Sequence, residues 1–248
     1  MIEKINQAAK SIKNAKKVSV FTGAGISVES GIPPFRGPDG LWSRYDPKSL
    51  DLNFYLSNPK QSWKVIKEIF YDFFGQAKPN KAHTILAEME AQGYISAIIT
   101  QNIDNLHQKA GSKNIIEFHG NSQRFVCPTC STQFGVHQIQ INDSPPICFE
   151  CKNILKPDFI FFGEDIPVAA FDKSIEIANT TDLMIIIGST GEVIPACNIP
   201  FLAKQNGALI IEINPSSSNF TNAITDSFLQ GKATEIMENL SKQISKNT

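Results

Sequence analysis

Short apolar runs alternate with amphipathic segments along most of the chain. Residues 2–16 place apolar side chains at helical spacing with lysines on the opposite face, and Val18–Thr22 is an apolar run typical of a strand. Further strands are predicted over 94–100, 114–118, 159–162, 183–187 and 208–213. Further helices are predicted over 63–74, 80–91, 168–179, 195–206 and 232–245. Strands that alternate with helices predict an α/β fold, in which helices cover both faces of a mostly parallel sheet.

A long irregular segment and an apolar helix are predicted between the first two strands. Residues 31–57 are rich in Pro, Gly and Asp and are predicted to form a long loop. The helix that follows should bury one side, formed by Trp63, Ile66, Phe70 and Phe73.

Four cysteines form two pairs with the spacing of a structural zinc site. They stand as Cys127-Pro-Thr-Cys130 and Cys148-Phe-Glu-Cys151, with seventeen residues between the pairs. A two-residue gap lets two sulfurs of one tight turn reach the same ion, and the second turn completes a tetrahedron. Two disulfides or buried free thiols are the alternatives. The surrounding segment, 121–156, has few apolar runs, so we predict a small module that needs the metal as part of its core.

The bulk composition bears on partners and compartment. The chain has 248 residues, 42% of them hydrophobic, and a net charge of −1. It therefore lacks a net positive charge that would attract nucleic acid or an anionic membrane. The N-terminus lacks the apolar core of a secretory signal, and no apolar run is long enough to span a bilayer. We expect a cytoplasmic protein, in which cysteine pairs are more often metal ligands than disulfides, and a buried Cys197.

Four of the predicted strands end in polar or glycine-rich segments. These are Gly23-Ala24-Gly25, Gln101-Asn102, Gly188-Ser189-Thr190 and Asn214-Pro215-Ser216. Because ligands of open α/β sheets bind at the carboxyl ends of the strands, we expect these segments to line one crevice. The first, together with Ser27, resembles the start of a dinucleotide-binding loop, although Val28 stands where a third small residue belongs. A nucleotide loop and an ordinary strand-to-helix turn both stay open, and an NAD dehydrogenase is disfavoured.

Three further segments carry side chains suited to chemistry at that crevice. Arg36 lies between an aromatic residue and a glycine, where it suits a phosphate or ribose contact or is simply solvated. Asn102 and Asp104 can hydrogen-bond a ribose or an amide, or Asp104 can cap a short helix. His119 ends a predicted strand beside a glycine and is the histidine best placed to act as a general base. The remaining histidines are expected to have structural or surface roles: His83, His107 and His137.

Taken in order, these segments resemble the sirtuin family of NAD-dependent protein deacylases. The matching stretches, which cover nearly the whole chain, are GAGIS (23–27), GIPPFRG (31–37), TQNIDNLH (100–107), FHGN (118–121), the two cysteine pairs, FFGE (161–164), GST and PA (188–190 and 195–196) and EIN (212–214). The resemblance implies a Rossmann-type domain and a small zinc-binding domain, with NAD and acyl-lysine meeting in the cleft between them. The implied boundaries are 1–36, 82–120 and 157–248 for the large domain, 37–81 for the cofactor loop and helical module, and 121–156 for the zinc-binding domain.

The resemblance also implies a role for each residue that matches a motif. His119 would be the general base, and Asn102 would share the catalytic site. The residues that bind NAD would be Gly23, Ala24, Gly25, Ser27, Phe35, Arg36, Gln101, Asn102, Ile103, Asp104, Gly188, Ser189, Thr190, Asn214, Pro215, Ser216 and Ala233. The acyl-lysine substrate would contact Ile160, Phe162, Gly163, Glu164, Glu192 and Val193. The ligands of one structural zinc ion would be Cys127, Cys130, Cys148 and Cys151.

The implied reaction consumes NAD as a co-substrate. The acyl oxygen attacks C1′ of the nicotinamide ribose as nicotinamide leaves, and His119 then draws a proton through the ribose hydroxyls. Water completes the release of lysine and O-acyl-ADP-ribose. This use of NAD agrees with the incomplete dinucleotide-binding motif. The expected partners are proteins or peptides that carry acyl-lysine, without membrane or nucleic acid, and a monomer is favoured.

Three positions depart from the commoner family pattern. Lys156-Pro157-Asp158 stands where many relatives have Arg-Pro and an uncharged residue. Glu192 stands where an apolar residue is usual, and we expect it to favour substrates with basic residues near the acyl-lysine. Relatives that remove acidic acyl groups carry Tyr-x-x-Arg, whereas this chain has Tyr71-Asp72-Phe73-Phe74 and no arginine to pair with a succinyl carboxylate. Removal of acetyl or other uncharged acyl groups is therefore predicted.

Other functions compete with deacylation. An ADP-ribosyltransferase uses the same NAD chemistry, and the sequence separates the two poorly. A zinc-ribbon nucleic-acid-binding module needs a basic, aromatic surface near the cysteines, where Arg124, Lys152 and Lys156 are offset by Asp143 and Glu150. Hydrolysis by a catalytic zinc needs an open coordination position, which four cysteines do not leave.

Overall fold

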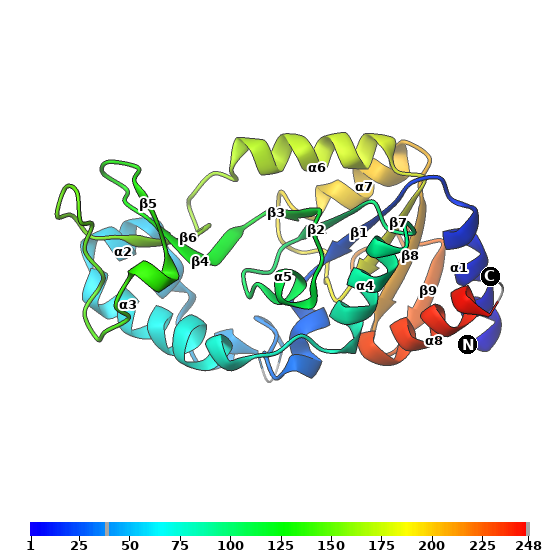
Figure 1. Cartoon of the computed structure of the whole chain (residues 1–248), viewed down its shortest axis with the longest axis horizontal. Helices are drawn as coiled ribbons and strands as arrows, with labels where there is room; N and C mark the ends of the chain where they lie inside the picture. Colours follow the sequence, from blue (N-terminus) through cyan, green and yellow to red (C-terminus); the bar gives the residue numbers. More distant parts are fainter. Residues whose placement is uncertain (38–39, 247–248) are drawn as a thin grey trace.

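Six parallel strands form the main sheet of the molecule (Figure 1). The computed structural model describes residues 1–37 and 40–246. In spatial order the strands are β3 (Ile115–Glu117), β2 (Ala97–Thr100), β1 (Val18–Thr22), β7 (Leu183–Ile187), β8 (Leu209–Asn214) and β9 (Ser227–Gln230). This is the strand order of a Rossmann fold, in which the direction of winding reverses between β1 and β7. The predicted α/β fold with a mostly parallel sheet is confirmed.

Helices cover both faces of the main sheet (Figure 1). On one face lie α1 (Ile2–Asn14), α4 (Lys81–Ala91) and α8 (Ala233–Ser245). On the other face lie α6 (Val168–Thr180) and α7 (Asn198–Gln205). Successive residues of a strand point to opposite faces, so Val20 packs in the first layer and Phe21 in the second. The unbroken apolar runs of the sequence follow from this burial on both faces.

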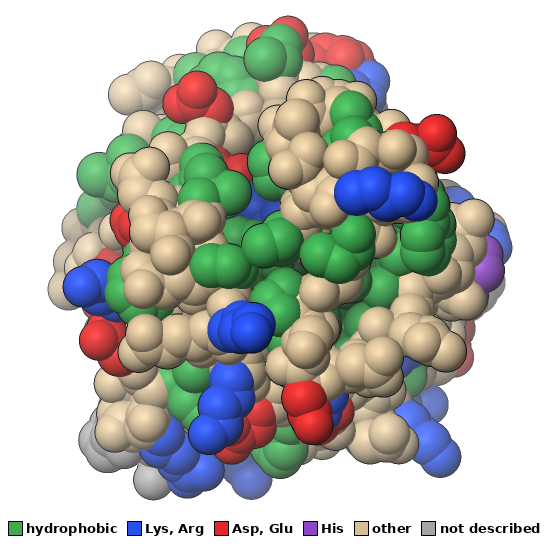
Figure 2. Space-filling view, turned by 90° about the vertical axis from the view of Figure 1, so that its left-hand side faces the viewer, with side chains coloured by type: hydrophobic (Ala, Val, Ile, Leu, Met, Phe, Trp, Pro, Cys, Tyr) green, Lys and Arg blue, Asp and Glu red, His purple; other side chains and the backbone are tan. Residues whose placement is uncertain are grey.

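A second, antiparallel sheet of three strands lies at the end of the molecule away from both termini (Figure 1). Its strands, in spatial order, are β5 (Gln133–Gly135), β4 (Gly120–Val126) and β6 (Lys156–Phe159). The helices that pack against it include α2 (Leu52–Ser57) and α3 (Pro59–Ile66). Trp63 of α3, Phe125 of β4 and Phe159 of β6 share one apolar core, which joins the helical module to the cysteine module. Figure 2 views this end, where hydrophobic side chains gather across the middle of the face.

The segment 31–57 is more regular than predicted. It contains α2 and two 3₁₀ helices, Leu41–Ser43 and Pro47–Leu50. The Asp46 carboxylate accepts a hydrogen bond from the Lys48 N–H at 2.9 Å. Likewise, Asp51 accepts from the Phe54 N–H at 2.8 Å. The prediction of a long loop is wrong because these Asp residues cap helical turns, which satisfies N–H groups that a helix start leaves free.

The apolar helix of the module buries three of the four positions on its predicted apolar side. It begins at Pro59 as α3 and continues as a π-helix over Lys67–Phe73. The wider π turn shifts the positions that face the core, so Phe73 is 53% exposed whereas Phe74 is buried. The prediction that Phe73 is buried is therefore wrong. The other predicted positions are buried: Trp63, Ile66 and Phe70.

The strand predicted over 159–162 lies earlier in the chain than expected. β6 pairs with β4 and ends at Phe159, so it belongs to the small sheet. Beyond it, Phe162 forms an isolated bridge with Asp51. β4 and β9 are not among the predicted strands, because neither contains an apolar run longer than two residues.

Domain limits, compartment and assembly remain predictions. The division into 1–36, 82–120 and 157–248, with 37–81 and 121–156 as separate modules, includes residues 38 and 39, which lie outside the described residues. Within the part of the chain that the structure describes, no helix is long and apolar enough to cross a membrane.

Replacement of Asn80 by Ala should destabilise the protein. The Asn80 side chain accepts from the N–H groups of Ala82 and His83, and the His83 ring accepts from the Asn80 N–H, which completes a capping box. We expect Asn80→Ala to lower the free energy of unfolding by about 1 kcal/mol in urea titrations. The matched control is Asn58→Ala, because Asn58 is the N-cap of α3 without a side-chain cap bond. Equal losses in the two variants would contradict the cap.

Candidate active site

The carboxyl ends of β1, β2, β7 and β8 meet at one edge of the main sheet. The Gly25 N–H donates to the Gly188 carbonyl (2.9 Å), which joins the loops after β1 and β7. The Gln101 side chain donates to Ser189 Oγ (2.9 Å). The Asn214 side chain donates to the Ser189 carbonyl (3.1 Å). Loops from all four strands thus meet at the point where the winding reverses, the usual position of a nucleotide.

Glycine is required where the loops after β1 and β7 touch. A Cβ atom on Gly25 would lie 2.6 Å from the Gly188 Cα, and one on Gly23 would lie 2.7 Å from the Gly188 carbonyl oxygen. Gly188 itself has a φ of +66°, a conformation that other residues rarely adopt. The glycines of both motifs therefore allow two backbone segments to approach each other closely.

Ser27 lies at the centre of a buried polar cluster. Its hydroxyl donates to Asp104 Oδ2 (2.7 Å) and accepts from Asn102 Nδ2 (3.3 Å). Burial raises the pKa of Asp104, and the hydrogen bonds from Ser27 and from the Leu106 N–H oppose this shift. The cluster holds Asn102 and Asp104, two predicted site residues, in fixed orientations at the edge of the sheet.

His83 contacts this cluster, a connection that the sequence did not reveal. Its Nδ1 lies 3.4 Å from the Asn80 backbone nitrogen and 3.0 Å from Asn80 Oδ1, and its Nε2 faces Ser27 Oγ at 3.4 Å. Burial lowers the pKa of His83 to about 4, so the ring is neutral at pH 7. His107 packs against it at 5.0 Å between ring centroids and contacts Thr22 Oγ1 at 3.0 Å. The signal that could have placed His83 is the capping box that begins at Asn80.

His119 lies where the main sheet passes into the small one. Its Nδ1 is 3.1 Å from the Gln101 carbonyl oxygen, which can only accept. The neutral ring therefore carries its proton on Nδ1 and its lone pair on Nε2. Burial lowers the pKa of His119, and the Gln101 carbonyl opposes this shift. The geometry leaves Nε2 as the atom that can take a proton, as a general base requires.

The segment 160–163 is attached at both ends. The Ile160 N–H donates to the His119 carbonyl (2.9 Å). Phe162 donates to the Leu50 carbonyl (2.8 Å) and accepts from the Leu52 N–H (3.0 Å). The Phe162 side chain is nevertheless 47% exposed. The segment thus connects the His119 backbone to the helical module and presents an aromatic ring to solvent.

The side chain of the buried Lys156 packs against the segment 160–163. Lys156 Nζ lies 2.9 Å from Glu164 Oε2, 2.7 Å from the Phe159 carbonyl oxygen and 4.4 Å from the centre of the Phe161 ring. Glu164 also accepts from the Phe161 N–H at 2.6 Å. Burial lowers the pKa of Lys156, and the Glu164 carboxylate opposes this shift. Glu164, predicted to contact substrate, therefore makes internal contacts that shape the segment.

Arg36 and Trp42, which lie between β1 and α2, contact two other segments of the chain. Arg36 Nε lies 3.3 Å from Glu192 Oε2, and both side chains are about half exposed (48% and 46%). Trp42 packs against Phe35 (5.3 Å between centroids) and Phe162 (6.1 Å). Glu192, predicted to attract basic peptides, thus faces an arginine of the same chain.

Glu212 is a buried carboxylate to which the sequence assigns no function. It accepts from the Asn214 side chain (2.8 Å), from Ser218 Oγ (2.5 Å) and from Thr225 Oγ1 (2.7 Å). It therefore orients Asn214 and ties down the loop that follows β8. The remaining predicted contacts are buried (Ile103, Ala233), half-buried (Ala24, Val193) or exposed (Gly163, Thr190, Pro215, Ser216).

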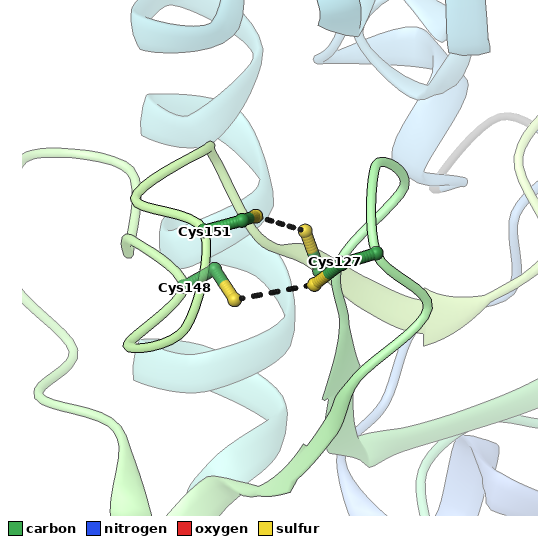
Figure 3. Close-up of side chains that lie close together, drawn as sticks. Cys127, Cys148 and Cys151 are labelled. Carbon is green, nitrogen blue, oxygen red and sulfur yellow. Dashed lines mark hydrogen bonds between the residues drawn. The ribbon is translucent and has the colours of Figure 1, made fainter.

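The four predicted zinc ligands come together as one cluster (Figure 3). Their sulfur atoms all lie within 4.8 Å of one another. Cys127 Sγ is 3.4 Å from Cys151 Sγ, and Cys130 Sγ is 3.6 Å from Cys148 Sγ. A tetrahedron with Zn–S bonds of about 2.3 Å has edges of about 3.8 Å, so the arrangement fits zinc. The cluster occupies two turns of the small module and contributes to its core.

The chain matches known proteins over almost its whole length. A family model described as Sir2 family matches residues 23–195. The chain belongs to the Sir2 family. One Sir2 relative is the NAD-dependent protein deacylase 2 of Pyrobaculum aerophilum, 39% identical over 237 residues (94% of this chain, 93% of the relative). Another is an NAD-dependent protein deacetylase of Caldivirga maquilingensis, 40% identical over 236 residues (94% and 90%).

Solved Sir2 structures share this fold. A Sir2 homologue mutant in complex with ADP-ribose has a TM-score of 0.93 and 38% identity, and covers 97% of this chain and 96% of its own. A Sir2 homologue in complex with NAD has a TM-score of 0.90 and 38% identity (97% and 94%). A Sir2 mutant with a deacetylated p53 peptide and 3′-O-acetyl ADP-ribose has a TM-score of 0.90 and 33% identity (96% and 98%).

Removal of zinc from this Sir2 chain should unfold the cysteine module. Trp63 packs on Phe125 (6.0 Å between centroids) and donates to the Asn142 carbonyl (2.8 Å), so its fluorescence reports on that module. In a Trp42→Phe background, a chelator should red-shift the Trp63 emission and abolish activity with the same time course. Loss of activity with unchanged emission would contradict a structural role for the metal.

Proposed function

We propose that this Sir2 chain is an NAD-dependent protein-lysine deacylase, which transfers the acyl group from lysine to ADP-ribose and releases nicotinamide. The observation that carries the proposal is His119. Its Nε2 carries the lone pair that can accept a proton, at the junction between the nucleotide edge of the main sheet and the segment 160–163. The names of the relatives, and solved structures with NAD or with peptide and acetyl ADP-ribose, support the same reaction.

The donor set at the crevice fits NAD. Asn102 and Asp104, held by Ser27, would contact the nicotinamide ribose. Ser189 and Asn214, on the other side of the reversal point, would contact the adenosine half. NAD supplies the electrophilic ribose carbon that receives the acyl oxygen. The protein's part is to bind and orient both substrates and to accept a proton at His119 Nε2.

The acyl-lysine would enter beside the segment 160–163. Phe162 offers an exposed ring there, and Ile160 lies directly beside the His119 backbone. We assign the peptide-contacting roles to these two residues, with Gly163 and Val193 at the rim. The expected bias of Glu192 toward basic peptides stays a prediction. The Arg36 guanidinium already neutralises part of the negative charge of Glu192.

Replacement of His119 should remove most of the activity. We expect His119→Ala to lower kcat for an acetyl-lysine peptide by about 10²–10⁴-fold, the usual contribution of a general base. His137→Ala is the matched control, because His137 is exposed in the cysteine module. Products should be followed by mass spectrometry. Full activity of His119→Ala would refute the assignment of His119 as the general base. ADP-ribose attached to protein would favour an ADP-ribosyltransferase instead.

The rate should depend on pH through the same group. Neutral His119 is the active form, so kcat/KM should rise as the pH rises through its pKa and then level off. Since burial lowers this pKa, the midpoint should lie below the ordinary histidine value of about 6.5. A midpoint above about 7 would contradict the environment described for the ring.

The chain should remove uncharged acyl groups in preference to acidic ones. Tyr71 stacks on Phe125 (5.5 Å between centroids), and Phe74 packs edge-on against Phe70 (5.3 Å), so the Tyr71–Phe74 register supplies aromatic rings and no cation. A desolvated carboxylate without a partner is costly. Butyryl and succinyl groups have the same number of carbon atoms. Two peptides of the same sequence that carry these groups therefore separate the effect of acyl charge from that of acyl length. We expect the succinyl peptide to react at least about tenfold more slowly, and equal rates would overturn this specificity.

A further inference from the structure

Two segments of chain cross between the main sheet and the small sheet, and they run against each other. One contains His119 and Gly120, and the other contains Asp158, Phe159 and Ile160. A Cβ atom on Gly120 would lie 2.3 Å from the Asp158 carbonyl oxygen, so the crossing leaves no room for a side chain. The position of the proposed base is therefore set by how these two segments are held together.

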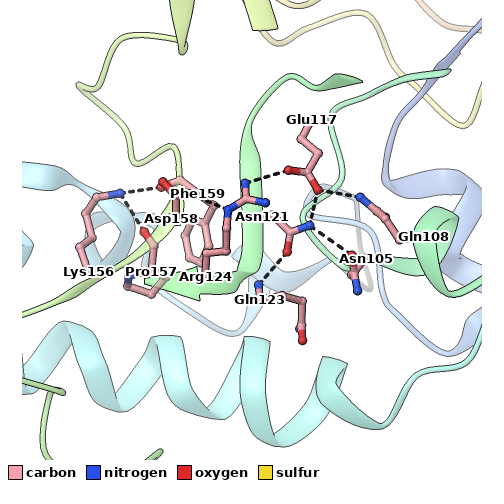
Figure 4. Close-up of polar contacts among 10 residues, drawn as sticks. All are labelled: Asn105, Gln108, Glu117, Asn121, Gln123, Arg124, Lys156, Pro157, Asp158 and Phe159. Atoms are coloured by element: carbon pink, nitrogen blue, oxygen red, sulfur yellow. Dashed lines mark hydrogen bonds and ion pairs between the residues drawn. The ribbon is translucent and has the colours of Figure 1, made fainter. Parts of the chain in front are cut away.

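A single arginine bridges the two sheets beside this crossing (Figure 4). Arg124 of β4 places Nη2 at 2.8 Å from Glu117 Oε2, and Glu117 ends β3 of the main sheet. Its Nε lies 2.9 Å from Asp158 Oδ2 on β6. The guanidinium group thus holds one carboxylate of each sheet at the same time, a geometry that its planar fork favours.

The second oxygen of Glu117 extends the contact to both sides of His119. Glu117 Oε1 accepts from the Gln108 side chain (2.6 Å) and from the Asn121 side chain. The Asn121 side chain also donates to Asn105 Oδ1 (3.2 Å). Residues two before and two after His119 are therefore tied to each other and to α5 (Leu106–Ala110), as Figure 4 shows.

We propose that Glu117, Arg124 and Asp158 form a clasp that positions His119 against the segment 160–163. This inference rests on the proposed roles of His119 and Ile160. Arg124 touches neither substrate in this proposal and is a positioning residue. Because the three side chains are partly exposed (42% for Arg124), the clasp contributes through geometry more than through stability.

The clasp predicts a selective kinetic defect in Arg124→Gln. We expect kcat/KM for an acetyl-lysine peptide to fall about fivefold, with KM for NAD within about twofold of the parent protein. Arg124→Lys should restore part of the loss, because a lysine reaches one carboxylate at a time. The matched control is Lys204→Gln. It removes the ion pair between Lys204 and Asp226, which is also partly exposed and is far in sequence from the crossing. It should leave both parameters unchanged.

Three results would overturn the clasp: parental kinetics in Arg124→Gln, the same loss in Lys204→Gln, or a loss confined to KM for NAD. Zinc content should be measured in every variant. If Arg124→Gln loses its zinc, the test passes to Asp158→Asn, which keeps the Arg124–Glu117 pair. A two- to threefold fall of peptide kcat/KM, about what one exposed pair contributes, supports the clasp, and no change overturns it. An active His119→Ala would refute the proposed function itself, whereas these outcomes concern the clasp.

Discussion

The close crossing at Gly120 is the constraint on which the rest of the site depends. Gly120 lies against Asp158 and Phe159 so tightly that a side chain cannot fit, and the Ile160 N–H then bonds the His119 carbonyl. The proposed base and the proposed substrate segment are thus neighbours through backbone contact, and the proposed clasp of Glu117, Arg124 and Asp158 lies beside that contact. Whatever moves the small sheet relative to the main sheet also moves one of these groups against the other.

The main sheet and the small module contribute to the site around that crossing in different ways. The Rossmann sheet brings four loops together where its winding reverses, and close glycine contacts let two of those loops touch. The small sheet has little apolar sequence of its own, so it shares a core with the helical module and needs four thiolates that fit zinc. A zinc ion held by these thiolates would stabilise the small module.

The sequence predicted the parts of the fold that follow from apolar runs and fixed spacings. The parallel sheet, the cysteine cluster and the meeting of loops at Ser189 were all predictable from such local patterns. The π turn that exposes Phe73 was not, because one extra residue in a turn leaves no mark on composition. The contacts of Glu164, Glu192 and Arg124 were also hidden, since each depends on residues brought together by the tertiary fold. Motifs identified which residues matter, whereas only the fold shows what each one touches.

A crystal structure of the chain with an acetyl-lysine peptide and a non-reactive NAD analogue tests the central claim most directly. The account predicts that the peptide lies along 160–163, with its acyl-lysine against Phe162, and that His119 Nε2 is within hydrogen-bond reach of the nicotinamide ribose. A peptide bound elsewhere, or a ribose beyond the reach of Nε2, would contradict it.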